Sequence, residues 1–155
     1  GHFSFVQKMP ALRILVIAGY EYAEEGEAAE GVVASLGNLP HLEELSLFAS
    51  LLKAADLPGV ARFPRLRVLD LSETMQDPLP SLRFFRKLPR LEALYLDAMP
   101  LTATQVRDLL SFSSLRALSH TSTGLECEDL KPLRSRYPHL KIRIDLECTD
   151  VKEED

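Results

Sequence analysis

A short pattern of leucines recurs along nearly the whole chain and constrains its fold more than any other feature. The pattern is Leu-x-x-Leu-x-Leu. It occurs as LRILVI, LEELSL, LRVLDL and LEALYL, followed by a degraded copy, LRALSH, and by LKIRIDL, in which plain alternation replaces the spacing. These segments begin at Leu12, Leu42, Leu66, Leu91, Leu115 and Leu140, so successive starts lie 30, 24, 25, 24 and 25 residues apart. Such even spacing predicts a stack of similar units.

A second element precedes each leucine segment. An apolar residue, a proline, a variable residue and the first leucine form MPAL, LPHL, FPRL, LPRL and YPHL, whereas FSSL in the fifth unit lacks the proline. Proline fixes φ and has no N–H to donate to a strand ladder, so it suits a turn immediately before a strand. We therefore expect each leucine segment to begin a short strand.

The residues between these strands have the spacing of helices. In ATQVRDLLSF the side chains of Val106, Leu109 and Leu110 share one helical face. Thr102 is placed to cap this helix. Two further segments have the same spacing. In LPSLRFFRKL the residues that should face the interior are Leu82, Phe85 and Leu88. In LECEDLKPLRSRY they are Leu125, Leu130 and Leu133. Each unit is then a strand, a turn and a helix, and because no unit can bury its apolar side alone, the units must stack.

The leucine segments over residues 12–146 resemble the leucine-rich-repeat family, and their helix-bearing units look most like its ribonuclease-inhibitor and F-box-associated branches. The resemblance implies an α/β fold, a right-handed superhelical solenoid with a concave parallel β-sheet and convex helices. It implies one domain over residues 1–155, with five repeats over 12–139 and a C-terminal capping strand and acidic tail over 140–155. We expect residues 1–11 to combine a two-residue tag remnant with the end of a preceding repeat or cap.

One position departs from the family pattern. Many family members carry Asn or Cys five residues after the second motif leucine, where the side chain satisfies backbone groups in the turn. Here the corresponding residues are Tyr20, Ser50, Thr74, Met99 and Thr123. Hydroxyl groups can partly serve at three of these positions, but tyrosine and methionine cannot form a regular ladder. We therefore expect looser and more irregular turns than in consensus repeats.

Composition and charge narrow the range of functions. With 155 residues, of which 46% are hydrophobic, the chain can bury one continuous core without metals or disulfides. A formal net charge of −5 provides no global basic field for a phosphate backbone, so nucleic acid is a disfavoured partner. The presence of only two cysteines favours a reduced, intracellular location, in the cytoplasm or alternatively the nucleus. No run approaches the roughly 18 apolar residues of a membrane span, so no membrane association is expected.

Alternate residues of each strand should point to the concave side of the sheet. The most prominent of these are the aromatic residues Phe48 and Tyr95 and the acidic residues Glu44, Asp70 and Asp97. Exposed aromatic side chains at the centre of a binding surface commonly supply much of the binding energy. We expect a basic or mixed-charge protein segment to bind these five residues. The alternative is that they are surface residues without a binding role.

The second position of the leucine segments carries charges of mostly alternating sign. The residues are Arg13, Glu43, Arg67, Glu92, Arg116 and Lys141, so opposite charges adjoin at four of the five interfaces between units. Neighbouring strands lie about 4.8 Å apart, which places these charges within reach of one another. We interpret the row as a structural device that disfavours a slip of one unit against the next.

Two other charged segments have less specific interpretations. The turn GYEYAEEGEAAEG after the first strand is either a functional loop or a solvated helix start with acidic residues at its positive end. The middle of the chain is basic, and most of its cations should line the convex and lateral surfaces. Only Phe84 and Phe85 could stack on bases there, and one of them should belong to the core, so nucleic-acid binding by this region is disfavoured.

Residues that look chemically active have simpler structural explanations. His120 replaces a motif leucine, so we expect a buried, hydrogen-bonded histidine near Thr123, or a strand that bends outward. Cys127, Cys148 and His139 lack the tight spacing of zinc motifs, and a disulfide between the cysteines is not required. Phosphate-binding loops, nucleophile elbows and metalloprotease helices have no counterpart in the sequence. We therefore expect no catalytic residues, no metal and no cofactor.

These observations favour a protein-interaction module, the recognition domain of a larger intracellular protein. F-box-like substrate adaptors have a similar architecture, but the sequence shows no F-box helices, so that role is an analogy only. The alternative is a structural or assembly subunit that packs permanently on another domain through its convex helices or its open end.

Overall fold

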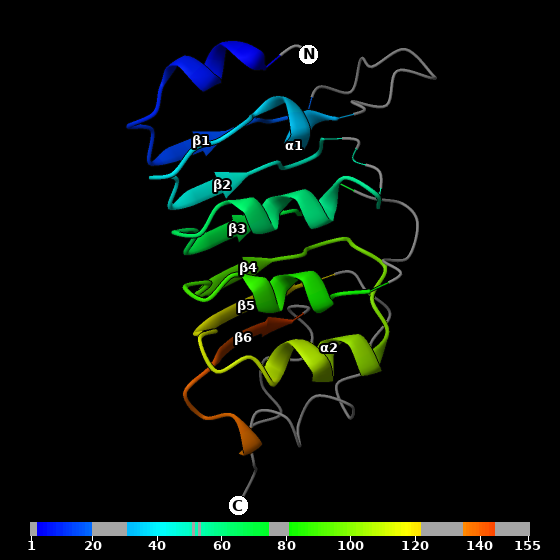
Figure 1. Cartoon of the computed structure of the whole chain (residues 1–155). Coiled ribbons are helices and arrows are strands. Elements are labelled where there is room, and N and C mark those ends of the chain that lie inside the picture. The colour runs from blue at the N-terminus through cyan, green and yellow to red at the C-terminus, as the bar shows by residue number, and fades with distance from the viewer. Residues whose placement is uncertain are drawn as a thin grey trace, which may run out of the picture.

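The computed structural model describes residues 3–19, 31–50, 52, 54–74, 81–121 and 135–144. These residues form an α/β structure around one six-stranded, all-parallel sheet, in which the strands follow one another in sequence order (Figure 1). The strands are β1 (Ile14–Val16), β2 (Glu44–Ser46), β3 (Val68–Asp70), β4 (Ala93–Tyr95), β5 (Ala117–His120) and β6 (Lys141–Ile144). The expected α/β class and parallel sheet are confirmed.

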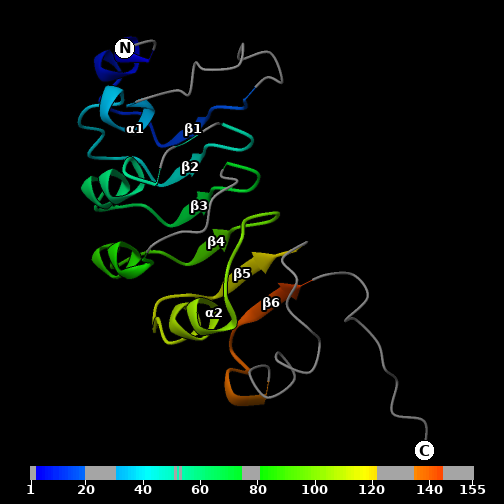
Figure 2. The same cartoon turned by 90° about the vertical axis from the view of Figure 1, so that its right-hand side faces the viewer.

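Short helical segments form a second layer beside the sheet, as Figure 2 shows. They are the 3₁₀ helices η1 (Ser4–Lys8), η2 (Leu57–Arg62) and η3 (Arg83–Lys87) and the α-helices α1 (Val32–Ser35) and α2 (Ala103–Leu110). The C-cap residue that follows each 3₁₀ helix directly precedes a proline, and its backbone angles are no longer helical. A proline disfavours helical backbone angles in the residue before it, so the repeated prolines keep these helices short.

Helix α2 has the N-terminal cap that the sequence predicts. The Oγ1 atom of Thr102 accepts a hydrogen bond from the backbone N–H of Gln105 at 3.2 Å. In return, Oε1 of Gln105 accepts a hydrogen bond from the backbone N–H of Thr102 at 2.8 Å. This reciprocal capping box satisfies two backbone donors at the start of the helix.

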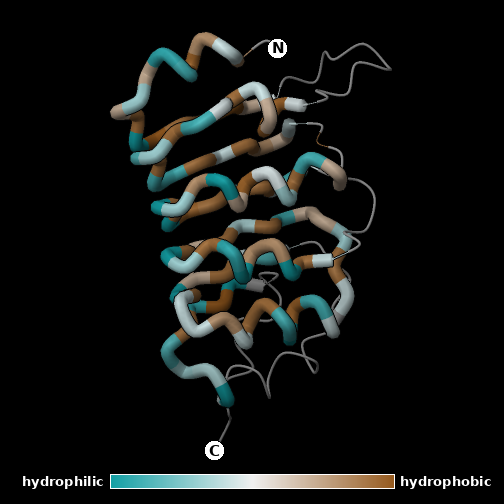
Figure 3. Tube along the Cα trace, viewed as in Figure 1, coloured by the Kyte–Doolittle hydropathy of each residue, from teal (hydrophilic) through white to brown (hydrophobic). Residues whose placement is uncertain are grey.

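The motif leucines lie in register and fill the space between the two layers. Leu45 pairs with Leu69, Leu69 with Leu94, and Leu94 with Leu118, and all four side chains are buried. The predicted interior residues of the helical segments are buried with them, among them Leu82, Phe85, Leu88, Val106, Leu109 and Leu110. Figure 3 shows apolar residues recurring in one strand after another. The predicted helix after residue 125 falls largely outside the described residues.

Three consecutive strands end in the same turn. Ala49, Glu73 and Ala98 have positive φ angles of 51°, 58° and 55°, and in each case the next residue donates its N–H to the carbonyl oxygen three residues earlier. The expectation of irregular turns is therefore wrong for these three, because backbone hydrogen bonds define them. Two predicted hydroxyl roles are confirmed, since Thr74 donates to the carbonyl of Leu71 at 2.6 Å and Ser50 to that of Ile17 at 3.4 Å. Tyr20 and Thr123 lie outside the described residues.

The last strand is shifted by one residue relative to the sequence alignment. Lys141 pairs with Ala117 and Arg143 with Ser119, so Lys141 occupies the third position of its unit and not the second. A shift of one residue exchanges the two faces of a strand. Lys141 and Arg143 consequently lie on the same side of the sheet as Glu44 and Asp70, and both are exposed.

Candidate functional site

The two faces of the sheet differ in their cover. The helical layer packs against one face, and within the described ranges the opposite face has no helix over it (Figure 2). We call this opposite face the open face. Its side chains come from alternate strand positions, in the rows Ile14, Glu44, Val68, Ala93, Ala117 and Lys141; Val16, Ser46, Asp70, Tyr95, Ser119 and Arg143; and Ala18, Phe48, Ser72, Asp97 and Thr121.

A hollow of about 240 Å³ lies on the open face over the first four strands. Ile14 and Val16 of β1 form its apolar side, and Tyr95 of β4 lies at the other side. Glu44 and Asp70 line it between them, which places two carboxylates beside the apolar surface. Small-molecule sites usually enclose roughly 300–1,000 Å³. The hollow on the open face is smaller than this range.

The structure brings three of the five predicted binding residues into this hollow, namely Glu44, Asp70 and Tyr95. The other two, Phe48 and Asp97, lie in the third row, toward the carboxyl ends of the strands. Phe48 is 40% exposed and Tyr95 is 38% exposed, so both aromatic side chains reach the surface as predicted. Glu44 is also exposed, whereas Asp70 and Asp97 are half-buried.

The two half-buried carboxylates hold neighbouring strands together. Asp70 accepts a hydrogen bond from the hydroxyl of Ser46 at 3.0 Å and another from the backbone N–H of Ser72 at 3.0 Å. Asp97 accepts from the hydroxyl of Ser119 and from the backbone N–H of Thr121, each at 2.8 Å to Oδ1. These aspartates therefore have a structural role in addition to the negative charge that they place on the open face.

Sequence reasoning did not select the apolar side of the hollow. Ile14 is 56% exposed and Val16 is 66% exposed, although both belong to the rows that the strand alternation predicts. The available signal was their position: these β-branched residues occupy places where the later strands carry Glu44, Ser46 or Asp70. Open-face alternation places them on the surface, and their apolar character makes them candidates for contact with a partner.

Charges of the second motif position form two ion pairs at the amino ends of the strands. Arg13 donates to Glu43 from Nε at 3.2 Å and from Nη2 at 2.7 Å. Arg67 donates to Glu92 from Nη2 at 2.7 Å. Hydrogen bonding from these guanidinium groups lowers the pKa of each glutamate below its ordinary value of 4.5.

The predicted alternation is thus only partly realised as ion pairs. Among the described residues, the Glu43–Arg67 and Glu92–Arg116 interfaces have no ion pair at contact distance, and Arg116 donates to backbone carbonyls instead. Lys141 is absent from the row because of the shift in β6.

The remaining predicted positions have structural explanations where the structure describes them. His120 is fully buried in β5, as expected for its place in the leucine pattern. Within the described ranges, no cluster of three or more His, Cys, Asp or Glu side chains could hold a metal ion. Cys127, Cys148 and Thr123, the acidic turn after β1 and the acidic tail lie outside those ranges.

Comparison with known proteins gives no family. Models of known protein families do not match this chain, and no curated protein matches it. The part of the chain that the structure describes contains no helix with the length and apolar character needed to cross a membrane.

Proposed function

We propose that this chain is a leucine-rich-repeat solenoid that binds a segment of a protein partner on its open face, which would be the concave side of the solenoid. The sequence order of the parallel strands, the register of the motif leucines and the single helical layer support this assignment. Its role is binding and not catalysis. It would serve as the recognition domain of a larger intracellular protein, a location that the low cysteine content supports.

The observation that carries the proposal is the gathering of exposed apolar side chains on one face together with carboxylates. Four of the six large hydrophobic residues that are exposed among the described residues lie on the open face: Ile14, Val16, Phe48 and Tyr95. Exposed apolar surface rimmed by polar residues is typical of a protein-interaction site. Aromatic side chains in such a setting commonly act as hot spots.

The charges of the open face indicate which kind of segment it would bind. Glu44, Asp70 and Asp97 lie over the first four strands, beside the apolar hollow. Lys141 and Arg143 lie on the last strand of the same face. Charge complementarity therefore favours a mixed-charge segment that places lysine or arginine near the hollow and acidic residues near β6.

The test is a selection of displayed random peptides on the intact chain, followed by affinity measurements with the selected peptides. We expect the peptides to combine lysine or arginine with a large apolar residue. The double variant Phe48→Ala/Tyr95→Ala should lower their affinity about tenfold or more, because truncation of a hot-spot residue costs about 2 kcal/mol.

A matched control is available in the same chain. Phe5 and Met9 are 56% and 48% exposed and belong to η1 and its C-cap. Helix η1 lies in the helical layer, on the other side of the sheet from the open face (Figure 2). The variant Phe5→Ala/Met9→Ala removes similar exposed apolar area and should leave the affinity of the selected peptides unchanged. Equal affinities for the wild type and the Phe48→Ala/Tyr95→Ala variant would exclude the open face as the binding site.

One observation favours a second candidate function, a permanent assembly contact at the β1 side of the sheet. Leu12, Leu15 and Ile17 are only half-buried, whereas the equivalent Leu42, Leu45 and Leu47 are almost fully buried. Phe5 and Met9 add exposed apolar surface at the same end. The variant Phe5→Ser/Met9→Ser should disrupt a stable assembly through this end. Sedimentation velocity measures the resulting change in the size of the assembly directly.

A further inference from the structure

A second surface, separate from the open face, lies at the amino ends of the strands. Here a hollow of about 580 Å³ extends across five successive units. Its charged side chains are predominantly cationic and come from the segments before β1, β2, β3, β4 and β5. The charged residues that line it are Arg13, Arg65, Arg67, Arg90 and Arg116, together with Glu43 and Glu92.

Most of the positive charge in this hollow is not neutralised by neighbouring carboxylates. Glu43 and Glu92 pair with Arg13 and Arg67, respectively. Arg65, Arg90 and Arg116 have no carboxylate at ion-pair distance within the described part of the chain. Five arginines less two glutamates leave an excess of three positive charges, although the whole chain has a formal net charge of −5.

Two of these arginines are held in position by neighbouring groups. Nη1 of Arg65 lies 2.8 Å from Nδ1 of His41, which belongs to the preceding unit. Nη1 of Arg116 donates to the backbone carbonyls of Ser113 and Leu115 at 3.0 and 3.3 Å. Contacts of this kind reduce the loss of side-chain freedom when the remaining guanidinium N–H groups bind an anion.

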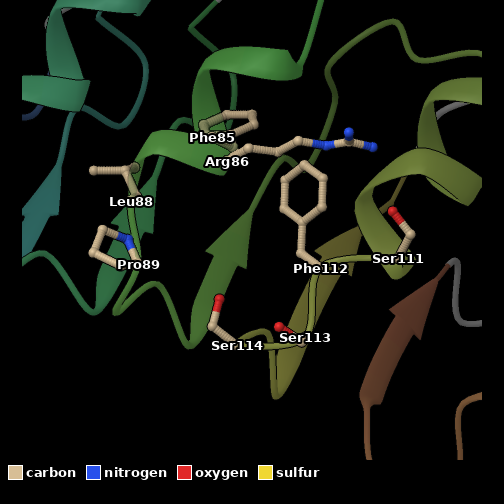
Figure 4. Close-up of a pocket in the computed structure, with 8 residues that line it drawn as sticks. All are labelled: Phe85, Arg86, Leu88, Pro89, Ser111, Phe112, Ser113 and Ser114. Atoms are coloured by element: carbon tan, nitrogen blue, oxygen red, sulfur yellow. The ribbon is translucent and has the colours of Figure 1, made fainter.

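A second hollow of about 490 Å³ adjoins the cationic one; its lining is mostly polar but includes Phe112 and Pro89. Figure 4 shows the residues that line this second hollow. The two hollows share Pro89 and Ser114. The ring of Phe112 forms part of this second hollow, and the guanidinium of Arg86 lies 5.5 Å from the centre of that ring. A segment crossing Pro89 and Ser114 would thus contact arginines first and an aromatic surface next.

We propose that these two hollows form one docking groove for an acidic segment of a protein partner, with a large apolar residue directly beside its carboxylates. Planar guanidinium groups bind carboxylates through paired hydrogen bonds, and three arginines are available for this purpose. The adjoining Phe112 surface would take the apolar residue. The groove is independent of the open face, so this inference does not rest on the proposed function.

The composition of the groove favours an acidic protein segment over nucleic acid. The cationic hollow is lined by no aromatic ring on which bases could stack.

The experiment uses fluorescein-labelled peptides and the intact chain, with fluorescence anisotropy at low ionic strength. The first peptide consists of six glutamates followed by leucine and phenylalanine, and the second replaces the last two residues by serines. We expect saturable binding of the first peptide and weaker binding of the second. The variant Arg65→Gln/Arg90→Gln should lower the affinity for both peptides by about tenfold or more.

A charge-matched control separates the groove from a general effect of charge. Arg83→Gln/Arg107→Gln removes two exposed arginines that line neither hollow and should change the affinity less than twofold. Circular dichroism verifies that both variants fold. Equal losses in both variants, or no saturable binding of the first peptide, would overturn the proposal. The proposal would also be overturned, in favour of nucleic acid, if an oligothymidylate of equal charge bound more tightly than the first peptide and lost affinity in the Arg65→Gln/Arg90→Gln variant.

Discussion

Ser119 of β5 donates its hydroxyl to the carboxylate of Asp97, which follows β4, with distances of 2.8 Å to Oδ1 and 2.9 Å to Oδ2. The backbone N–H of Thr121 donates to the same carboxylate at 2.8 Å. Ser119 is almost fully buried, so this carboxylate provides its hydroxyl with a hydrogen-bond partner away from water. A residue predicted to bind a partner thus also joins two adjacent strands.

This double role predicts a difference between two acidic residues of the open face. Asp97→Ala should lower the free energy of unfolding by about 1–3 kcal/mol, because it leaves the buried hydroxyl of Ser119 unsatisfied. Glu44→Ala removes an exposed carboxylate that accepts no hydrogen bond from the described residues, and should change stability by no more than about 0.5 kcal/mol. Urea denaturation of both variants measures the difference, and equal stabilities would show that the Asp97 contacts do not stabilise the fold.

The same contacts show how far sequence reasoning reaches for this chain. Leucine spacing is sufficient to predict the parallel strands and the buried face, because each motif leucine must find the same apolar interior. The partners of Asp97 lie in the next unit, 22 and 24 positions further along the chain, so its hydrogen bonds depend on the register between units. The motif alignment gives that register but does not show which side chains form hydrogen bonds across it, so the sequence supports only an interpretation of Asp97 from its charge.

The shift in β6 has a related cause. The segment LKIRIDL alternates apolar and polar residues, so its leucine and isoleucine side chains can face the interior in more than one alignment with the earlier units. The structure pairs Ile142 with Leu118 and Ile144 with His120. Alternation predicts a strand there but does not determine which residue adjoins Ala117, and the cationic end of the open face was missed for that reason.

The capping box of α2 predicts a measurable contribution to stability. Thr102→Ala removes the side-chain acceptor of the Gln105 N–H and should lower the free energy of unfolding by about 1 kcal/mol. Thr102→Ser retains the hydroxyl and should recover most of the loss. Thermal denaturation followed by circular dichroism provides the measurement, and the cap would contribute nothing if the alanine and serine variants melted together.

The two ion pairs predict a pH dependence of stability. Hydrogen bonds from Arg13 and Arg67 lower the pKa of Glu43 and Glu92 in the folded state. Their contribution to stability is therefore fully present above the ordinary carboxyl pKa of 4.5, and it is lost as the pH falls through the lower folded values. Both pairs are partly exposed, so salt should weaken the effect.

The control for this pH dependence is the variant Glu43→Gln/Glu92→Gln. Other carboxylates also titrate in the acid range, so the informative quantity is the difference in unfolding free energy between wild type and variant. That difference should be constant from neutral pH down to about pH 5 and should shrink below it. A difference that does not change with pH would show that these two pairs contribute no charge-dependent stability.

The repeated turn after the strands leads to a prediction of the opposite sign, a gain in stability. Ala98 has a φ angle of 55°, a conformation that is unfavourable for residues with a Cβ atom by about 1–2 kcal/mol, whereas glycine adopts it freely. Glycine also increases the conformational entropy of the unfolded chain, which offsets part of the gain. Ala98→Gly should therefore raise the free energy of unfolding by about 0.5–1 kcal/mol.

Ala34→Gly provides the matched comparison, since Ala34 is an exposed residue in helix α1, where the backbone is right-handed. There the same substitution should lower stability by roughly 0.5–1 kcal/mol, because only its entropic cost and the lower helix propensity of glycine remain. Urea denaturation of both variants should give changes of opposite sign. A loss of stability in both variants would mean that the positive φ angle of Ala98 costs little free energy. The recurrence of this turn after three strands would then reflect only the backbone hydrogen bonds within the turns.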